Sequence, residues 1–165
     1  MDYQDISRVN SEIVMIDMRG KDYAMVSERV TAFRKLWPEG FIKTEIVKMS
    51  DDGKIVIMRA KVGYYNQNGE EVILATGLAK EVQGQGMVNS TSHVENCESS
   101  ACGRALGFLG LGLNGGGICS AEELANAIVA QKQIEKAEKD EIKAANNATK
   151  GKDIGGVEVA DTIPF

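Results

Sequence analysis

The sequence predicts an α+β fold: an antiparallel β-meander of three strands, or four if residues 11–18 join it, packed against helices and followed by a long C-terminal helix and a flexible tail. Turn-forming residues at 51–53 and 68–69 divide residues 41–81 into three runs of strand-like composition. Apolar residues recur at helical spacing on both sides of that stretch. From residue 146 onward the chain becomes polar and glycine-bearing, which is typical of a disordered tail.

The N-terminal part predicts one short strand and one helix. We expect the strand at 11–18, a turn at Arg19-Gly20-Lys21, and a helix that Asp22 caps and that runs to about Leu36. Pro38 and Gly40 end that helix. One face is apolar: Tyr23, Val26, Val30, Phe33 and Trp37. Four charged residues fall largely off that face: Glu28, Arg29, Arg34 and Lys35.

Three strands are predicted at 41–49, 54–65 and 71–81. Successive side chains of a strand point to opposite faces. The second strand therefore has one largely apolar face: Val56, Met58, Ala60, Val62 and Tyr64. The other face carries two cations among apolar residues: Ile55, Ile57, Arg59 and Lys61. We expect the first face to meet the core.

Residues 89–120 concentrate small residues, cysteines and the only histidine. A helix is predicted from about Ser92 to Leu109, with Ser92 and Glu95 placed as a capping box. Its buried stripe is predicted to be Val94, Cys97, Ala101, Ala105 and Phe108. Gly103 and Gly107 imply that another backbone comes close. A glycine loop at 110–117 follows, and a second capping box at Ser120 and Glu123 opens a helix at 121–145.

Length and composition fit one domain, residues 1–145, with a tail at 146–165. No apolar run is long enough to span a membrane and no leader is evident, so we expect a cytoplasmic protein. Three irregularly spaced cysteines favour reduced thiols. The net charge of -5 argues mildly against a nucleic-acid ligand, but residues 19–61 hold ten basic against six acidic residues.

Several motifs suggest chemistry that their context does not support. Residues 110–115 match G-x-G-x-x-G, but a helix precedes them where a dinucleotide fold needs a strand. His93 and Cys97 lie one turn apart, yet a closed zinc site needs about four ligands. Cys102 as a nucleophile would need a base. We therefore expect no enzyme, no metal and no cofactor.

Nucleic-acid phosphates are the ligand that the cations favour. Arg59 and Lys61, with Lys43 or Lys48 nearby, are candidates for a groove that follows a phosphate backbone. The alternative is an ordinary solvated sheet face. Arg104 contacts a phosphate or, equally well, caps the glycine loop or pairs with Glu98 or Ser100. Either Tyr64 or Tyr65 is placed to stack on bases.

The order of elements and the segment ENCESSACGRALGFLGLG, residues 95–112, resemble the phage single-strand annealing proteins of the essential-recombination-function superfamily. Asn66-x-x-Gly69-Glu70 and Ala75-Thr76-Gly77 are similar to what precedes that helix in the family. The likeness covers roughly residues 22–120. It implies a homo-oligomer, in which a ring is one arrangement, and a basic groove for single-stranded DNA.

The last residues, Asp161-Thr162-Ile163-Pro164-Phe165, resemble the C-terminal tip of bacterial single-stranded DNA-binding proteins. A Pro-Phe end with its free carboxylate suits an apolar pocket with a basic rim. Asp161, Ile163, Pro164 and Phe165 are thus the predicted contacts with host replication or repair proteins. The alternative is a frayed terminus.

The sequence therefore predicts sequence-independent binding of single-stranded DNA, with strand annealing as an extension, in phage or prophage replication and recombination. Two rivals stay open. One is a protein-interaction module for host takeover or anti-defence without DNA affinity. The other is an enzyme on nucleotides or nucleic acid, for which no metal or base is evident.

Overall fold

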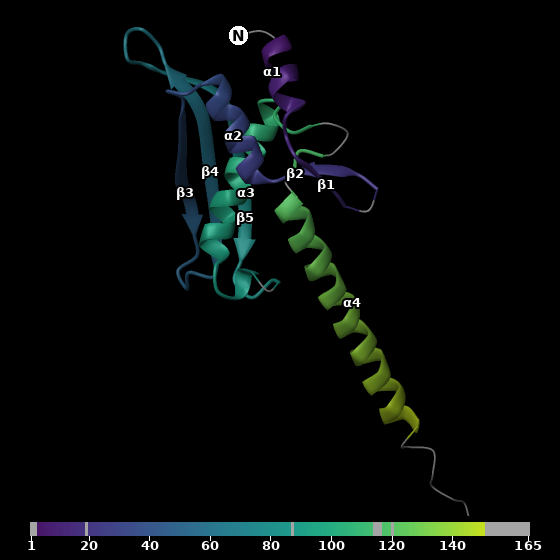
Figure 1. Cartoon of the computed structure of the whole chain (residues 1–165). Coiled ribbons are helices and arrows are strands. Elements are labelled where there is room, and N and C mark those ends of the chain that lie inside the picture. The colour runs from purple at the N-terminus through teal and green to yellow at the C-terminus, as the bar shows by residue number, and fades with distance from the viewer. Residues whose placement is uncertain (1–2, 19, 87, 114–116, 120, 151–165) are drawn as a thin grey trace, which may run out of the picture. The chain divides into compact units, whose positions relative to one another are not determined.

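The computed structural model describes residues 3–18, 20–86, 88–113, 117–119 and 121–150, and it confirms an α+β fold (Figure 1). By contacts the chain divides into two units, Met1–Ala130 and Gln131–Phe165. The elements are α1 (Tyr3–Asn10), β1 (Met15–Asp17), β2 (Asp22–Ala24), α2 (Val26–Leu36), β3 (Phe41–Met49), β4 (Ile55–Tyr65), β5 (Glu71–Val82), the 3-10 helix η1 (Val88–Ser90), α3 (His93–Phe108) and α4 (Ala121–Lys150).

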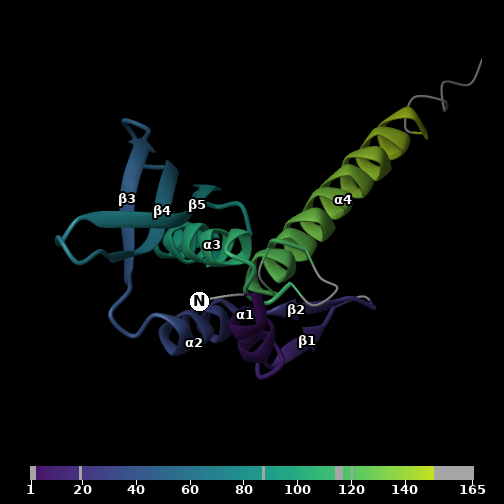
Figure 2. The same ribbon diagram turned by 90° about the horizontal axis from the view of Figure 1, so that it is seen from above.

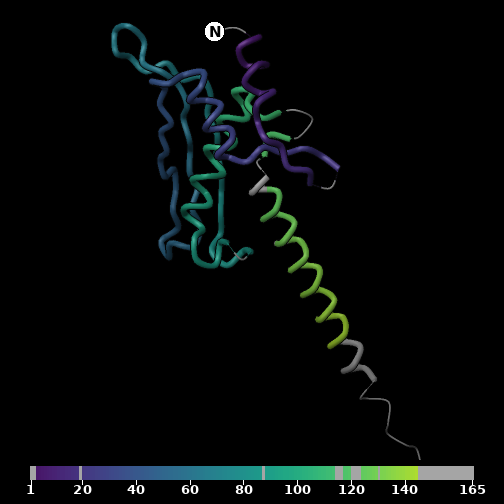
Figure 3. The backbone as a smooth tube through the Cα atoms, viewed as in Figure 1, coloured from purple at the N-terminus to yellow at the C-terminus, as the bar shows by residue number. Residues whose placement is uncertain are grey.

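The predicted three-stranded meander is confirmed, with β4 between β3 and β5 and both pairings antiparallel. Gly53 and Gly69 occupy the hairpin turns with φ of 71° and 78°, the left-handed region that glycine adopts at little cost. The register shifts once in each pairing, between Ile46 and Lys48 and between Val62 and Gly63. The tube in Figure 3 follows this meander into α3.

One face of the sheet is covered by α3, and α2 packs on α3 (Figures 1 and 2). The predicted apolar face of β4 supplies the sheet side of the core: Val56, Met58, Ala60 and Val62 are all buried. The small side chains of Cys97, Ala101 and Ala105 meet it from α3 and have no exposed surface. These small residues let the helix lie close to the sheet.

The backbone of α3 comes very close to the sheet at Gly77 of β5. A Cβ atom there would collide with the backbone at Ala101 and Ala105, which no side-chain rotation relieves. We expect Gly77→Ala to destabilise the fold by about 1–3 kcal/mol, since the helix must move off the sheet. Urea unfolding measures this. Thr76→Ala, on an exposed neighbour, is the matched control and is expected to stay within about 0.5 kcal/mol of wild type.

The N-terminal region differs from its prediction. Residues 3–10 form a helix that was not expected, and residues 11–18 do not join the meander. Instead β1 pairs with β2 in a separate two-stranded sheet, so Asp22 begins a strand and α2 begins only at Val26. Burial explains the change, because the β2 strand places both Tyr23 and Ala24 in the interior.

The ends of the later helices also differ in part. Ser92 is the N-cap of α3, but its side chain makes no capping hydrogen bond, so the capping box does not form. Phe108, predicted to be buried, is 61% exposed, whereas its neighbours Leu106 and Gly107 are buried, so Phe108 lies off the packed face of α3. Helix α4 continues to Lys150, and its side chains at 131–144 are exposed. Ser120 and the tip 161–165 lie outside the described residues.

No helix in the described part of the chain combines the length and the apolar character needed to cross a membrane.

Candidate nucleic-acid interface

The face of the sheet opposite α3, called here the open face, carries the predicted cations. Cross-strand partners share a face, so the register places Lys43 beside Lys61, and Glu45 beside Arg59. Its described cations are Lys43, Lys48, Arg59, Lys61 and Lys80, against the two acids Glu45 and Glu71. Four of the five cations predicted to contact DNA therefore gather on one surface.

Apolar side chains lie among these cations. Ile73 is 48% exposed and Leu78 53% exposed, although both belong to a strand inside a folded unit. The register puts Leu78 in one row with Arg59, and Ile73 in one row with Gly63. A surface that mixes cations with exposed apolar groups differs from a merely solvated sheet face, which carries mostly polar residues.

Glu45 is shared by two of the cations. Its Oε1 lies 3.1 Å from Nη1 of Arg59 and 3.1 Å from Nζ of Lys61. The hydrogen bond from Lys61, followed by the charges of Lys61 and then Arg59, holds the pKa of Glu45 below its usual value. Glu45 therefore stays ionised throughout the neutral range and partly neutralises the centre of the open face.

Lys43 joins the cationic rows to an aromatic pair. Its Nζ lies 5.2 Å from the ring centroid of Phe41 and 5.5 Å from that of Tyr65. It also forms an ion pair with Glu71. Hydrogen bonds to Glu71 and then to Tyr65 raise the pKa of Lys43. Tyr65 itself is 48% exposed.

Lys48 and Lys80 flank Ile57 in one row of the open face. Neither has an ion pair among the residues that the structure describes, so both amines are available to an anionic ligand. Sequence reasoning missed Lys80. The alternation within β5 was visible, but its pairing with Ile57 depends on a register that local sequence does not specify.

The two candidate tyrosines lie on opposite sides of the end of β4, because they are adjacent in a strand. Tyr65 is on the open face, and Tyr64 is directed toward the α2 side. Both border one hollow of about 510 Å³, called here the aromatic pocket. Its lining residues are Leu36, Trp37, Pro38, Glu39, Gly40, Tyr64 and Tyr65.

Arg104 is not on the open face. Its Nε donates a hydrogen bond to the backbone oxygen of Leu78 at 3.3 Å, at the edge strand β5. The structural role considered for Arg104 therefore applies, but with a different acceptor: β5 in place of the glycine loop, Glu98 or Ser100. Its place in a DNA contact set is not supported by this geometry.

Arg29 caps the glycine loop instead, and the prediction that it lies off the apolar face is wrong. Its guanidinium is completely buried between α2, α3 and the loop. Its Nη1 donates to the backbone oxygens of Gly103 at 2.7 Å and Ile118 at 2.6 Å. Its Nη2 donates to those of Gly112, Gly117 and Cys119 at 3.4, 3.5 and 3.1 Å. No local sequence pattern pairs Arg29 with this backbone, because its acceptors lie 74 to 90 residues away along the chain.

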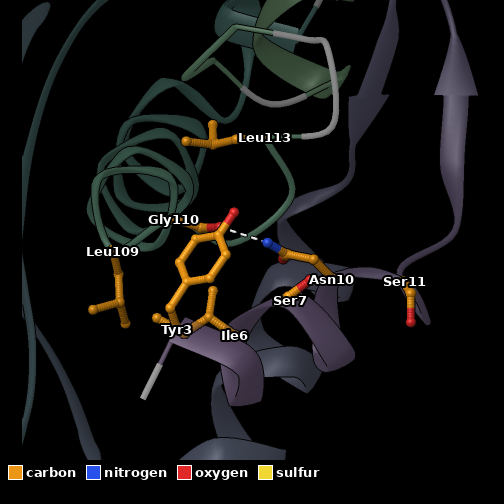
Figure 4. Close-up of a pocket in the computed structure, with 8 residues that line it drawn as sticks. All are labelled: Tyr3, Ile6, Ser7, Asn10, Ser11, Leu109, Gly110 and Leu113. Carbon is orange, nitrogen blue, oxygen red and sulfur yellow. Dashed lines mark hydrogen bonds between the residues drawn. The ribbon is translucent and has the colours of Figure 1, made fainter. Parts of the chain in front are cut away.

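The start of the glycine loop is a helix terminus, as its context predicted. Gly110 and Gly112 have φ of 97° and 70°. Asn10 of α1 brackets them: its Nδ2 donates to Gly110 O at 2.8 Å, and Gly112 N–H donates to its Oδ1 at 3.0 Å. Figure 4 shows this contact beside a pocket of about 500 Å³, into which Tyr3 projects and from which Ser11 points away. No cation lines it.

The other candidate groups on α3 make structural contacts. His93 Nε2 lies 2.8 Å from the backbone oxygen of Gly53, and Cys97 Sγ lies 3.6 Å from that of Val56. Among the described residues no three metal-binding side chains cluster. His93 and Cys97 are thus engaged with the β3–β4 hairpin and with β4.

Burial, and to a lesser degree the charge of Glu98, raises the pKa of Cys102 to about 11. Only about one thiol in a thousand is then ionised at pH 8. We expect alkylation of Cys102 by iodoacetamide to be slow at pH 8 and to accelerate as pH rises toward 11. Peptide mass spectrometry after timed alkylation measures it. Rapid labelling at neutral pH would contradict this and would reopen the nucleophile hypothesis.

Comparison with known families found a similarity in the central part of the chain. Residues 30–109 match the Slr1353 N-terminal dsRNA-binding domain-like family. This part of the chain, slightly less than half of it, is therefore similar to a dsRNA-binding-like domain. The match begins within α2, includes the whole sheet and ends just after α3. Comparisons with curated proteins and with solved structures found no match.

Proposed function

We propose that the chain binds nucleic acid on the open face, without sequence preference, and that single-stranded DNA is its preferred ligand. The single observation that carries the proposal is the mixture on that face of cations with exposed apolar and aromatic side chains. Single-strand binders combine a cationic track for phosphates with flat side chains on which bases stack. The match to a dsRNA-binding-like family supports the broader class of ligand.

Double-stranded RNA is the second candidate, favoured by the name of the matched family. Duplex RNA is recognised mostly by shape and by contacts to phosphates and 2′-hydroxyls. Cations suffice to contact the phosphates of duplex RNA. The exposed Ile73, Leu78 and Tyr65 would then have no role in binding. The apolar component therefore favours an unpaired strand.

Fluorescence anisotropy with labelled oligo-dT, at several salt concentrations, tests the proposal. Phosphate contacts release counterions, so the logarithm of the affinity is expected to fall linearly with the logarithm of the salt concentration. Unlabelled single-stranded DNA, duplex DNA and duplex RNA serve as competitors. The proposal fails if oligo-dT does not bind at low salt or binds independently of salt. Stronger competition by duplex RNA selects the second candidate.

The biological setting proposed from the sequence resemblance is phage or prophage recombination, with the tip at 161–165 recruiting host replication or repair proteins. Deleting these five residues separates this role from DNA binding. Partner capture is expected to be lost while oligo-dT affinity is kept. A chain that captures partners through the tip but binds no nucleic acid would favour the protein-interaction alternative.

A further inference from the structure

The aromatic pocket lies where the cationic rows of the open face end. Tyr65 belongs to both surfaces, and Lys43 lies over the Tyr65 ring while it shares a row with Lys61. The pocket thus adjoins the proposed phosphate track at Tyr65. Its volume of about 510 Å³ is within the range of small-ligand sites.

The aromatic rings at the pocket are held in place by others behind them. Trp37 stacks on Phe33 with 5.4 Å between ring centroids and 28° between planes. Tyr65 packs on buried Phe41 at 5.3 Å and 55°. Rings that are already immobilised lose little conformational entropy when a flat ligand stacks on them.

We infer that the aromatic pocket receives one unpaired nucleobase of the strand that lies on the open face. This inference rests on the proposed function. Lys43, at the junction of pocket and track, contacts the phosphate next to the inserted base. A base paired within a duplex is stacked between its neighbours and reaches the pocket only after unpairing. The pocket therefore gives the open face its preference for single strands.

The sequence contains one tryptophan, so the emission of Trp37 reports on the pocket without a label. We expect oligo-dT to quench this emission as it binds. An oligonucleotide of equal length with abasic sites throughout keeps the phosphates but offers no base. It is expected to bind more weakly, by roughly tenfold, and to leave the emission unchanged. Anisotropy of labelled strands measures binding in parallel.

Tyr65→Leu removes the aromatic ring and keeps a smaller apolar side chain, and Tyr65→Phe keeps the ring. We expect Tyr65→Leu to weaken oligo-dT binding about tenfold and to weaken binding of the abasic strand much less, because only the contact between Tyr65 and Lys43 is lost there. Tyr65→Phe is expected to behave as wild type. Tyr3→Leu, on the 83% exposed tyrosine of α1, is the matched control outside the open face.

The outcomes separate the two ideas. If neither strand binds, the proposed function fails. If both strands bind with equal affinity and Trp37 emission does not change, nucleic-acid binding stands and the base pocket is overturned. Equal loss of affinity for both strands in Tyr65→Leu also overturns it, because such a loss reports a change in the track and not a missing stack.

Discussion

Arg29→Met is expected to destabilise the unit Met1–Ala130 by more than about 3 kcal/mol. The substitution keeps much of the buried volume but removes the donors for five backbone oxygens, of which those of Gly103 and Gly112 take part in buried hydrogen bonds. Each buried acceptor left without a partner costs about 1–3 kcal/mol. Urea unfolding followed by circular dichroism measures the free energy of unfolding.

Arg29→Lys distinguishes charge from geometry. A single ammonium group cannot span acceptors that the planar guanidinium contacts from both terminal nitrogens, so most of the destabilisation is expected to persist. Arg8→Met is the matched control. The Arg8 side chain is 64% exposed, and its ion pair with Glu12, at 3.8 Å, lies on the surface. It is expected to cost less than about 0.5 kcal/mol. Equal stability of the Arg29 and Arg8 variants would contradict the capping role.

The second large effect is expected on nucleic-acid affinity. Replacing Arg59 and Lys61 together with alanine removes the two cations at the centre of the open face. We expect affinity for oligo-dT at low salt to fall at least about tenfold. The slope of log affinity against log salt is expected to become shallower by about 1.4, since each phosphate contact on a single strand contributes about 0.7.

The chain provides a matched control for this double substitution. Arg8 and Lys35 share the Glu12 carboxylate, at 3.8 and 2.7 Å, much as Arg59 and Lys61 share Glu45. Arg8→Ala with Lys35→Ala removes equal charge away from the sheet and is expected to change affinity far less.

Glu45→Gln is expected to act in the opposite direction, because it leaves the pair of cations uncompensated. The affinity for oligo-dT is expected to rise. Glu12→Gln removes an equivalent carboxylate outside the open face and is its matched control. If the Arg59/Lys61 and Arg8/Lys35 double variants weaken binding equally, the affinity depends on net charge alone and the open face is not the binding site.

The sequence by itself determined the fold class, the meander and the division of β4 into two faces. These features depend on local chemistry. Glycines such as Gly53 and Gly69 occupy the left-handed turn positions, and alternation along a strand assigns Val56 and Arg59 to opposite sides. The sequence alone could therefore group four cations: Arg59, Lys61, Lys43 and Lys48.

The tertiary structure decided what depends on distant partners. Lys80 joined the open face through the register between strands, and Arg104 was placed away from that face, with a hydrogen-bond acceptor on β5. Arg29 has an ordinary helical position in sequence, yet it is buried because carbonyls up to 90 residues away converge on it. Helical periodicity records which way a side chain points along its own helix, and it carries no information about which backbone arrives to meet it.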